Sequence, residues 1–322
     1  MQRLNCPSAV NRLTFSPDGD MLAGVNGSLY CWTRSQDWAL TGLHGSILGL
    51  HGSISDVRFH PGGRTLVYAA SVTRFLAERP PLLERVRTIQ LYPLTATRQF
   101  DQDQLQIVSD SPAVSATLWV QRIAFTPDAR TLLANRFELR GIWSTQTSIL
   151  SWHFNPSGAQ WQVANAVPGR TVADKGAALV GDTWLALAGP WGIELCPLEP
   201  STLPLAVPGT SKAKLVVASP RGELVAAAYE RHFRLWHLRR EQSVVSWQVP
   251  PQSVSALAFS PDGRTLAIGD SARTVTFHDA LTGTRGSAYD FGVGPIQSLA
   301  YAPDGLTLAI AGSNGLVVID VE

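Results

Sequence analysis

A proline-centred turn recurs along the chain, and a repeat of this kind constrains the fold more than any single residue does. Proline fixes φ at the second turn position, and the glycine that follows tolerates a positive φ. Alternating apolar residues precede each turn and a second apolar run follows it, which predicts an antiparallel hairpin. The turns read FSPDG, FHPGG, FTPDA, ASPRG, FSPDG and YAPDG, with their prolines at Pro17, Pro61, Pro127, Pro220, Pro261 and Pro303.

Residues 254–283 contain one complete repeat unit. Its strands Val254–Phe259 and Thr265–Ile268 flank the turn, and a third apolar run, Thr274–His278, leads into HDALTG. Three proline spacings, of 41, 42 and 44 residues, equal one unit. A spacing of 66 is a unit with an insertion, and one of 93 is two units whose middle turn has eroded. Seven units result, starting near residues 10, 53, 118, 175, 212, 253 and 295.

These motifs resemble those of WD-repeat β-propellers. HDALTG at 278–283 stands where that family has WD-x-x-T-G, and Trp32-Thr33, Trp236-His237 and Ile319-Asp320 occupy equivalent sites. The resemblance covers essentially the whole chain. It implies one all-β domain, residues 1–322, built as a seven-bladed β-propeller of four-stranded antiparallel sheets.

The position of the fourth strand follows from its offset before the next proline. In the regular unit this strand is Val244–Gln248, and the same offset predicts the fourth strand of the first unit at Ile47–Gly49. Applied to the first proline, the offset places Gln2–Asn5 as the outer strand of the last sheet. The N-terminal strand would then join the last blade and close the ring, which removes exposed sheet edges.

Two units carry extra residues between their second and third strands. The first insertion is VTRFLAERPPLLERV at about 72–86, where Leu82–Val86 could form a turn of helix. The second is RFELRGIWSTQT at 136–147, which predicts a third strand at Ile149–Phe154 and a fourth at Trp161–Val167. In an alternative register, Glu138–Trp143 is the third strand. Because both insertions are links of the same kind in adjacent units, we expect them on one face.

The insertions bring aromatic and arginine side chains to that face, and such residues are enriched at the centre of interaction surfaces. The alternative is that the insertions fold back and bury their own apolar groups. The predicted partner-binding residues are Phe75, Arg74, Leu82, Leu83, Arg85, Phe137, Arg140 and Trp143, joined by Trp191 and Trp119.

A cluster of charges on first strands suggests a different function. Asp56 and Arg58 lie two residues apart in a strand, so they share one face of the sheet and predict an ion pair. Arg12 and Arg122 hold matching positions in other units. The alternative function is therefore a small-molecule or anion-binding, or hydrolytic, propeller that uses its central channel.

Other kinds of chemistry find little support in the sequence. The three cysteines, Cys6, Cys31 and Cys196, form no C-x-x-C pair, and the seven histidines form no H-x-x-x-H, so we expect neither metal nor cofactor. There is no G-x-S-x-G motif, and we expect no enzyme. A net charge of +1 disfavours nucleic-acid binding.

No apolar run approaches the roughly 18 residues that a membrane span needs. We therefore expect a cytoplasmic protein that does not bind a membrane. The basic residues are nearly all arginine, which favours a bacterial source. The sequence therefore predicts a non-enzymatic scaffold that binds a protein or peptide partner on the face with the insertions. A further alternative is one subunit of a larger assembly whose other members carry the chemistry.

Overall fold

The computed structural model describes residues 1–44, 52–78, 81–94, 106–108, 118–126, 128–140, 144–155, 160–167, 176–181, 183–189, 191–198, 204–207, 212–229, 232–238, 242–248 and 253–321. The chain divides into two compact units. The middle unit comprises Thr14–Arg170, and the terminal unit joins Met1–Leu13 to Thr171–Glu322. Each unit is built from four-stranded antiparallel sheets, as predicted.

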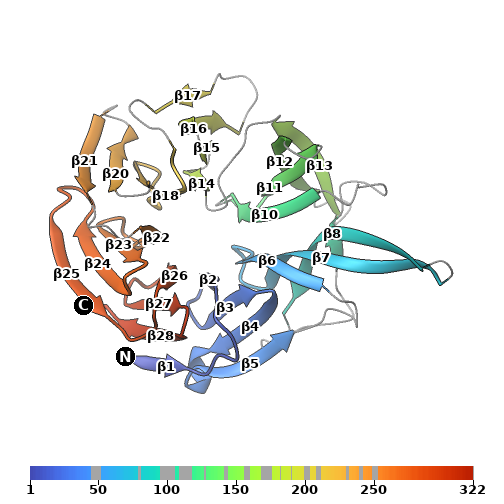
Figure 1. Ribbon diagram of the computed structural model, residues 1–322, viewed down its shortest axis with the longest axis horizontal. Coiled ribbons are helices and arrows are strands. Elements are labelled where there is room, and N and C mark those ends of the chain that lie inside the picture. The colour runs from blue at the N-terminus through green and yellow to red at the C-terminus, as the bar shows by residue number, and fades with distance from the viewer. Residues whose placement is uncertain are drawn as a thin grey trace. The chain divides into compact units, whose positions relative to one another are not determined.

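The middle unit holds three sheets, and the boundary between the units falls inside the first strand, β2. A short 3-10 turn, η1 (Arg34–Gln36), follows the third strand of the first sheet. The strands, in sheet order, are β2 (Arg12–Phe15), β3 (Met21–Asn26), β4 (Ser28–Thr33) and β5 (Ala39–His44); β6 (Gly52–Phe59), β7 (Thr65–Glu78), β8 (Pro81–Pro93) and β9 (Gln106–Val108); and β10 (Leu118–Phe125), β11 (Thr131–Arg140), β12 (Ser144–Asn155) and β13 (Gln160–Val167) (Figure 1).

The terminal unit holds four sheets, the last of which takes its outer strand from the N-terminus. The strands, in sheet order, are β14 (Ala177–Val180), β15 (Trp184–Gly189), β16 (Gly192–Pro197) and β17 (Leu205–Ala206); β18 (Leu215–Ala218), β19 (Leu224–Ala228), β20 (His232–His237) and β21 (Gln242–Gln248); β22 (Val254–Phe259), β23 (Thr265–Asp270), β24 (Thr274–Asp279) and β25 (Arg285–Asp290); and β26 (Ile296–Tyr301), β27 (Thr307–Gly312), β28 (Gly315–Asp320) and β1 (Gln2–Leu4).

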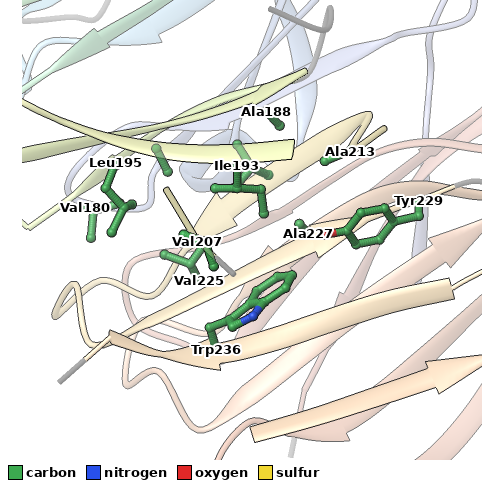
Figure 2. Packing of buried hydrophobic residues seen from close by; sticks show 12 residues of the cluster. Val180, Ala188, Ile193, Leu195, Val207, Ala213, Val225, Ala227, Tyr229 and Trp236 are labelled. Atoms are coloured by element: carbon green, nitrogen blue, oxygen red, sulfur yellow. The ribbon is translucent and has the colours of Figure 1, made fainter. Parts of the chain in front are cut away.

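Sheets that follow one another in sequence bury their faces against each other. In β19, Leu224, Ala226 and Ala228 pack against the sheet of β22–β25, while Val225 and Ala227 pack against the sheet of β14–β17. Figure 2 shows the second of these contacts, where Val225, Ala227 and Trp236 lie against the strand that carries Ile193. Because successive side chains of a strand point to opposite faces, a strand buried on both faces reads as a continuous apolar run.

The pairing of the N-terminal strand with the last sheet is confirmed. In β1, Gln2 pairs with Val318 and Leu4 pairs with Leu316 of β28. The side chain of Arg3 adds a further contact, since its Nη2 donates a hydrogen bond of 3.0 Å to the carbonyl of Gly292. The closed ring of seven blades stays a prediction from the sequence.

The predicted fourth strand at Ile47–Gly49 is wrong. The fourth strand of the first sheet is β5, and positions 45–51 lie outside the described residues. The 3-10 turn reverses the chain directly after β4, because Asp37 and Trp38 both adopt left-handed backbone conformations with φ of 54° and 57°. Trp38 is buried and its ring lies 6.0 Å from that of Phe15 in an edge-to-face contact. The extra residues of this repeat therefore follow the fourth strand.

The described residues of both insertions belong to strands. The residues proposed as a helical turn, Leu82–Val86, belong to β8, since each residue there pairs with β7 instead of with its own chain neighbours. In the other insertion, β12 pairs with β13 from Ile149↔Val167 to Asn155↔Gln160. This confirms Ile149–Phe154 as third strand and Trp161–Val167 as fourth strand, and excludes the register in which Glu138–Trp143 is the third strand.

Candidate functional site

The β7–β8 hairpin continues past the sheet that it begins in. The pairing of β6 with β7 ends at Gly52↔Val72, and that of β9 with β8 ends at Val108↔Ile89. Beyond Val72, β7 and β8 pair with each other as far as Glu78↔Pro81, and with no other strand of the described part of the chain. Figure 1 shows this two-stranded extension reaching away from its sheet, and we call residues 73–85 the ribbon.

Five predicted partner-binding residues lie in the ribbon. The register pairs Arg74 with Glu84, Phe75 with Leu83, and Arg85 with Thr73, and Leu82 pairs with Ala77 at a bulge. The ribbon therefore brings together two basic and three apolar residues that are separated in the sequence.

The β11–β12 hairpin carries most of the other predicted residues in this unit. Phe137 pairs with Trp119 of β10, and Arg140 pairs with Ser144 near the tip. Strand β10 contacts both β7 and β8, so the two insertions come from neighbouring elements of one unit. Trp143 lies outside the described residues.

Trp191 lies in the terminal unit. It follows Gly189 in the turn between β15 and β16 and is half-buried. The sequence predicted that Trp191 joins the insertions, because it also lies in a link between a second and a third strand.

The predicted ion pair between Asp56 and Arg58 is confirmed. Oδ1 of Asp56 lies 3.3 Å from Nη1 of Arg58, and Asp56 is fully buried. The other carboxylate oxygen accepts a hydrogen bond of 2.9 Å from the backbone N–H of Ile123 in β10. Nη1 of Arg58 also donates to the carbonyl of Val57 over 2.7 Å.

The other two arginines of the proposed channel cluster lie on β2 and β10. Arg12 is buried in β2, and its Nη1 donates to the carbonyl of Asn11 over 3.0 Å. For Arg122 the structure describes the backbone, which follows a β-bulge between Val120 and Arg122. Asp56 is thus occupied by Arg58 and by a backbone amide, which makes it a link between two sheets.

The described residues offer little for metal or nucleophilic chemistry. Among them, no three His, Cys, Asp or Glu side chains gather where they could hold a metal ion. Burial raises the pKa of the Cys31 thiol to about 12, so this thiol stays protonated at neutral pH. Over the same part of the chain, no helix is long and apolar enough to cross a bilayer.

The sequence analysis missed an apolar groove in the terminal unit, lined by Phe277, Tyr289 and Phe291 among others. A signal was present, because YDF places two aromatic residues at alternate positions of a stretch that is otherwise small and polar. Alternation of this kind puts both rings on one side of an extended chain.

The geometry defines a class of all-β protein in which one four-stranded antiparallel sheet is repeated along the chain. Comparison with protein families finds a match in two segments of the chain. The family described as WD domain, G-beta repeat matches residues 1–33 and 242–279. Residues 1–33 and 242–279 are therefore similar to WD repeats.

The two matched segments share one arrangement of strands. Residues 1–33 span β1 to β4 and residues 242–279 span β21 to β24, so each match begins with an outer strand and continues into the first three strands of the next sheet. WD repeats generally mediate protein–protein interaction. No curated protein matches this chain.

Proposed function

We propose that the protein is a seven-bladed WD-repeat scaffold without enzymatic activity, which binds a protein or peptide partner through the ribbon and the β11–β12 hairpin. The observation that carries the proposal is the ribbon itself, whose strands, among the described residues, pair with each other and with no further strand beyond Val72. An isolated two-stranded ribbon is marginally stable in water. A bound partner supplies the missing packing.

The residues of the ribbon support this role. Its apolar positions include Phe75, Leu82 and Leu83, and its described arginines are Arg74 and Arg85. Aromatic residues and arginine dominate the energetics of protein interfaces, because they combine a large contact area with directed hydrogen bonds.

Photo-crosslinking tests the proposal. A benzophenone amino acid replaces Phe75 in the full chain expressed in its native host, and the crosslinked partner is identified by mass spectrometry. A matched variant carries the same group at Leu281, which is exposed in the turn after β24. We expect a defined adduct from position 75 that the variant at position 281 does not give.

Measuring the affinity of the purified partner for variants of the chain then shows whether the ribbon binds the partner or only lies near it. In one variant an Asn-Gly turn joins Val72 to Val86 and replaces the ribbon; another combines Phe75→Ala with Trp143→Ala. Each variant should bind the partner with an affinity at least tenfold lower than that of the wild type. Asp56→Asn, a change in the proposed channel cluster, should leave its affinity unaltered. Equal affinity for the wild type and the ribbon-deleted chain would contradict the proposal.

A further inference from the structure

An apolar groove of about 560 Å³ lies in the terminal unit between the sheet of β22–β25 and the sheet that contains β28. Phe277, Tyr289 and Phe291 line one side, and Ile319 and Val321 line the other. Tyr289 is 50% exposed, although its neighbour Phe277 packs against the core. A large aromatic side chain that is half open to water beside other apolar groups is characteristic of a binding surface.

The aromatic wall is held in place by local structure. The ring of Tyr289 lies 6.3 Å from that of Phe277 and 5.8 Å from that of Phe291. After Tyr289, Oδ1 of Asp290 accepts a hydrogen bond of 2.8 Å from the N–H of Gly292, which adopts a φ of 69°. Arg3 donates to the carbonyl of the same glycine. A site that is ordered before binding loses less conformational entropy when a ligand arrives.

Strand β25 borders the groove, and in the part of the chain that the structure describes no strand pairs with its outer edge. It pairs with β24 on one side and ends the sheet on the other, and all six of its residues are exposed. An edge strand presents unpaired N–H and C=O groups that can hydrogen-bond a further extended chain. Ser287 and Tyr289 both line the groove, at alternate positions of β25, so alternate side chains of an added strand would reach it.

A charged side chain in the groove favours some apolar ligands over others. Asp320, exposed at the end of β28, is the one charged side chain among the residues that line it. A basic side chain on the ligand can therefore pair with Asp320.

The size of the groove argues against a second folded copy as its occupant. Nine residues line it, whereas a stable interface between folded proteins uses roughly 20–30 residues a side. Its volume falls within the range of about 300–1,000 Å³ that is usual for sites of small ligands. A short segment with one or two large side chains fits this size.

We infer that this groove binds an extended peptide segment of a partner protein, one that carries a large apolar side chain and a lysine or arginine. The peptide lies along the outer edge of β25, its apolar side chain contacts Tyr289 and Phe291, and its basic side chain pairs with Asp320. This site lies outside the ribbon, and its existence does not depend on the function proposed for the ribbon.

Selection from a random dodecapeptide library displayed on phage tests the inference. The full chain is the target, and peptides that also bind the Ser287→Arg variant are removed, because that change adds bulk and positive charge to the groove from an exposed position. We expect the selected peptides to combine a large apolar residue with a basic one.

Fluorescence anisotropy of the labelled synthetic peptides then gives their affinities. Tyr289→Ala and Ser287→Arg should each weaken binding by about tenfold or more, and Asp320→Asn should do so only for peptides that keep their basic residue. Leu281→Ala is the control, because Leu281 is equally exposed but does not line the groove. Thermal unfolding of each variant shows that the fold is kept.

Three outcomes would overturn the inference. One is a selection that yields no peptide sensitive to Ser287→Arg, and another is a selected set in which acidic residues replace basic ones. The third is concentration-dependent self-association of the wild type in sedimentation velocity that Tyr289→Ala abolishes, since the groove would then hold a second copy of the chain.

Discussion

The guanidinium group of Arg58 lies 3.3 Å from the carboxylate of Asp56, a side chain that is fully buried in β6. The same carboxylate accepts a hydrogen bond from the N–H of Ile123 in β10. One acidic side chain thus joins two neighbouring sheets of the middle unit while its charge is balanced within its own strand. Arg58 remains 27% exposed, so its guanidinium group keeps part of its hydration.

Asp56→Ala should lower the free energy of unfolding by about 3 kcal/mol, because it removes the link to Ile123 and leaves the Arg58 charge without its partner. Asp56→Asn keeps an acceptor for the Ile123 amide and should cost less. Urea unfolding followed by circular dichroism measures both changes. If the two substitutions cost the same, the hydrogen bond between the sheets contributes nothing and the prediction fails.

The sequence was most informative where strands are buried on both faces. β23 is buried from Leu266 to Gly269, and the predicted strand, Thr265–Ile268, ends within two residues of its observed end at Asp270. The outer strands gave a weaker signal, since a strand such as β25 is exposed along its whole length and needs no apolar pattern. The misplaced fourth strand of the first sheet, at Ile47–Gly49 instead of β5, is an error of this kind.

The β-bulges were also not predicted, although they recur at equivalent positions between the third and fourth strands of several sheets. The pairing of third with fourth strands shifts just before Trp32, Trp152, Trp236 and His278. A bulge inserts one residue without changing the composition of the strand, so periodicity does not reveal it. The groove was missed for a related reason, because it depends on how the turn at Gly292 places Phe291 against a neighbouring sheet.

Deletion of Gln2–Asn5 should lower the melting temperature by about 5 °C or more. It removes β1, exposes the outer edge of β28 and takes away the buried side chain of Leu4, and burying one leucine contributes about 2 kcal/mol. Thermal unfolding followed by circular dichroism gives the value. Arg3→Ala is the control, since it removes the contact with Gly292 but keeps the backbone pairing, and its effect should be smaller. An unaltered melting temperature in the deletion would refute a structural role for β1.

Some of the proline turns are braced by a serine and an aspartate, whereas the ASPRG turn keeps the serine but lacks the aspartate. Ser260 Oγ donates to Oδ1 of Asp262 over 2.6 Å and accepts from the N–H of Thr265 over 2.9 Å. Oδ1 of Asp262 also accepts from the N–H of Arg264 over 2.9 Å. In the ASPRG turn, Ser219 Oγ still accepts from the N–H of Leu224, but Arg221 takes the place of the aspartate.

Asp262→Ala should therefore cost about 1 kcal/mol of stability, through the loss of its two hydrogen bonds. The reverse change, Arg221→Asp, should stabilise the protein by a somewhat smaller amount, because it supplies the missing acceptor in a turn that already has its serine. Urea midpoints of both variants provide the test. A destabilised Arg221→Asp variant would show that the aspartate depends on more than its own turn.

His278 should make stability depend on pH below neutrality. Burial lowers the pKa of this histidine from its ordinary 6.5, and the positive charge of Arg285 lowers it further, against a hydrogen bond to the backbone of Gly283 that raises it. The unfolded chain then binds a proton more readily than the folded chain does. The contribution of His278 is complete above about pH 6.5, and it is lost as the pH falls toward the lower pKa of the folded state.

Replacing His278 by glutamine removes this proton-binding group, so stability should fall less steeply between pH 7 and pH 5 than in the wild type. Urea midpoints at several pH values compare the two slopes. His60→Gln serves as a parallel case, since burial also lowers the pKa of His60. Arg285→Gln should raise the pKa of His278 in an NMR titration, because it removes the second cause of the shift. If the slopes of the wild type and His278→Gln coincide, His278 titrates alike in both states and its burial has no energetic consequence.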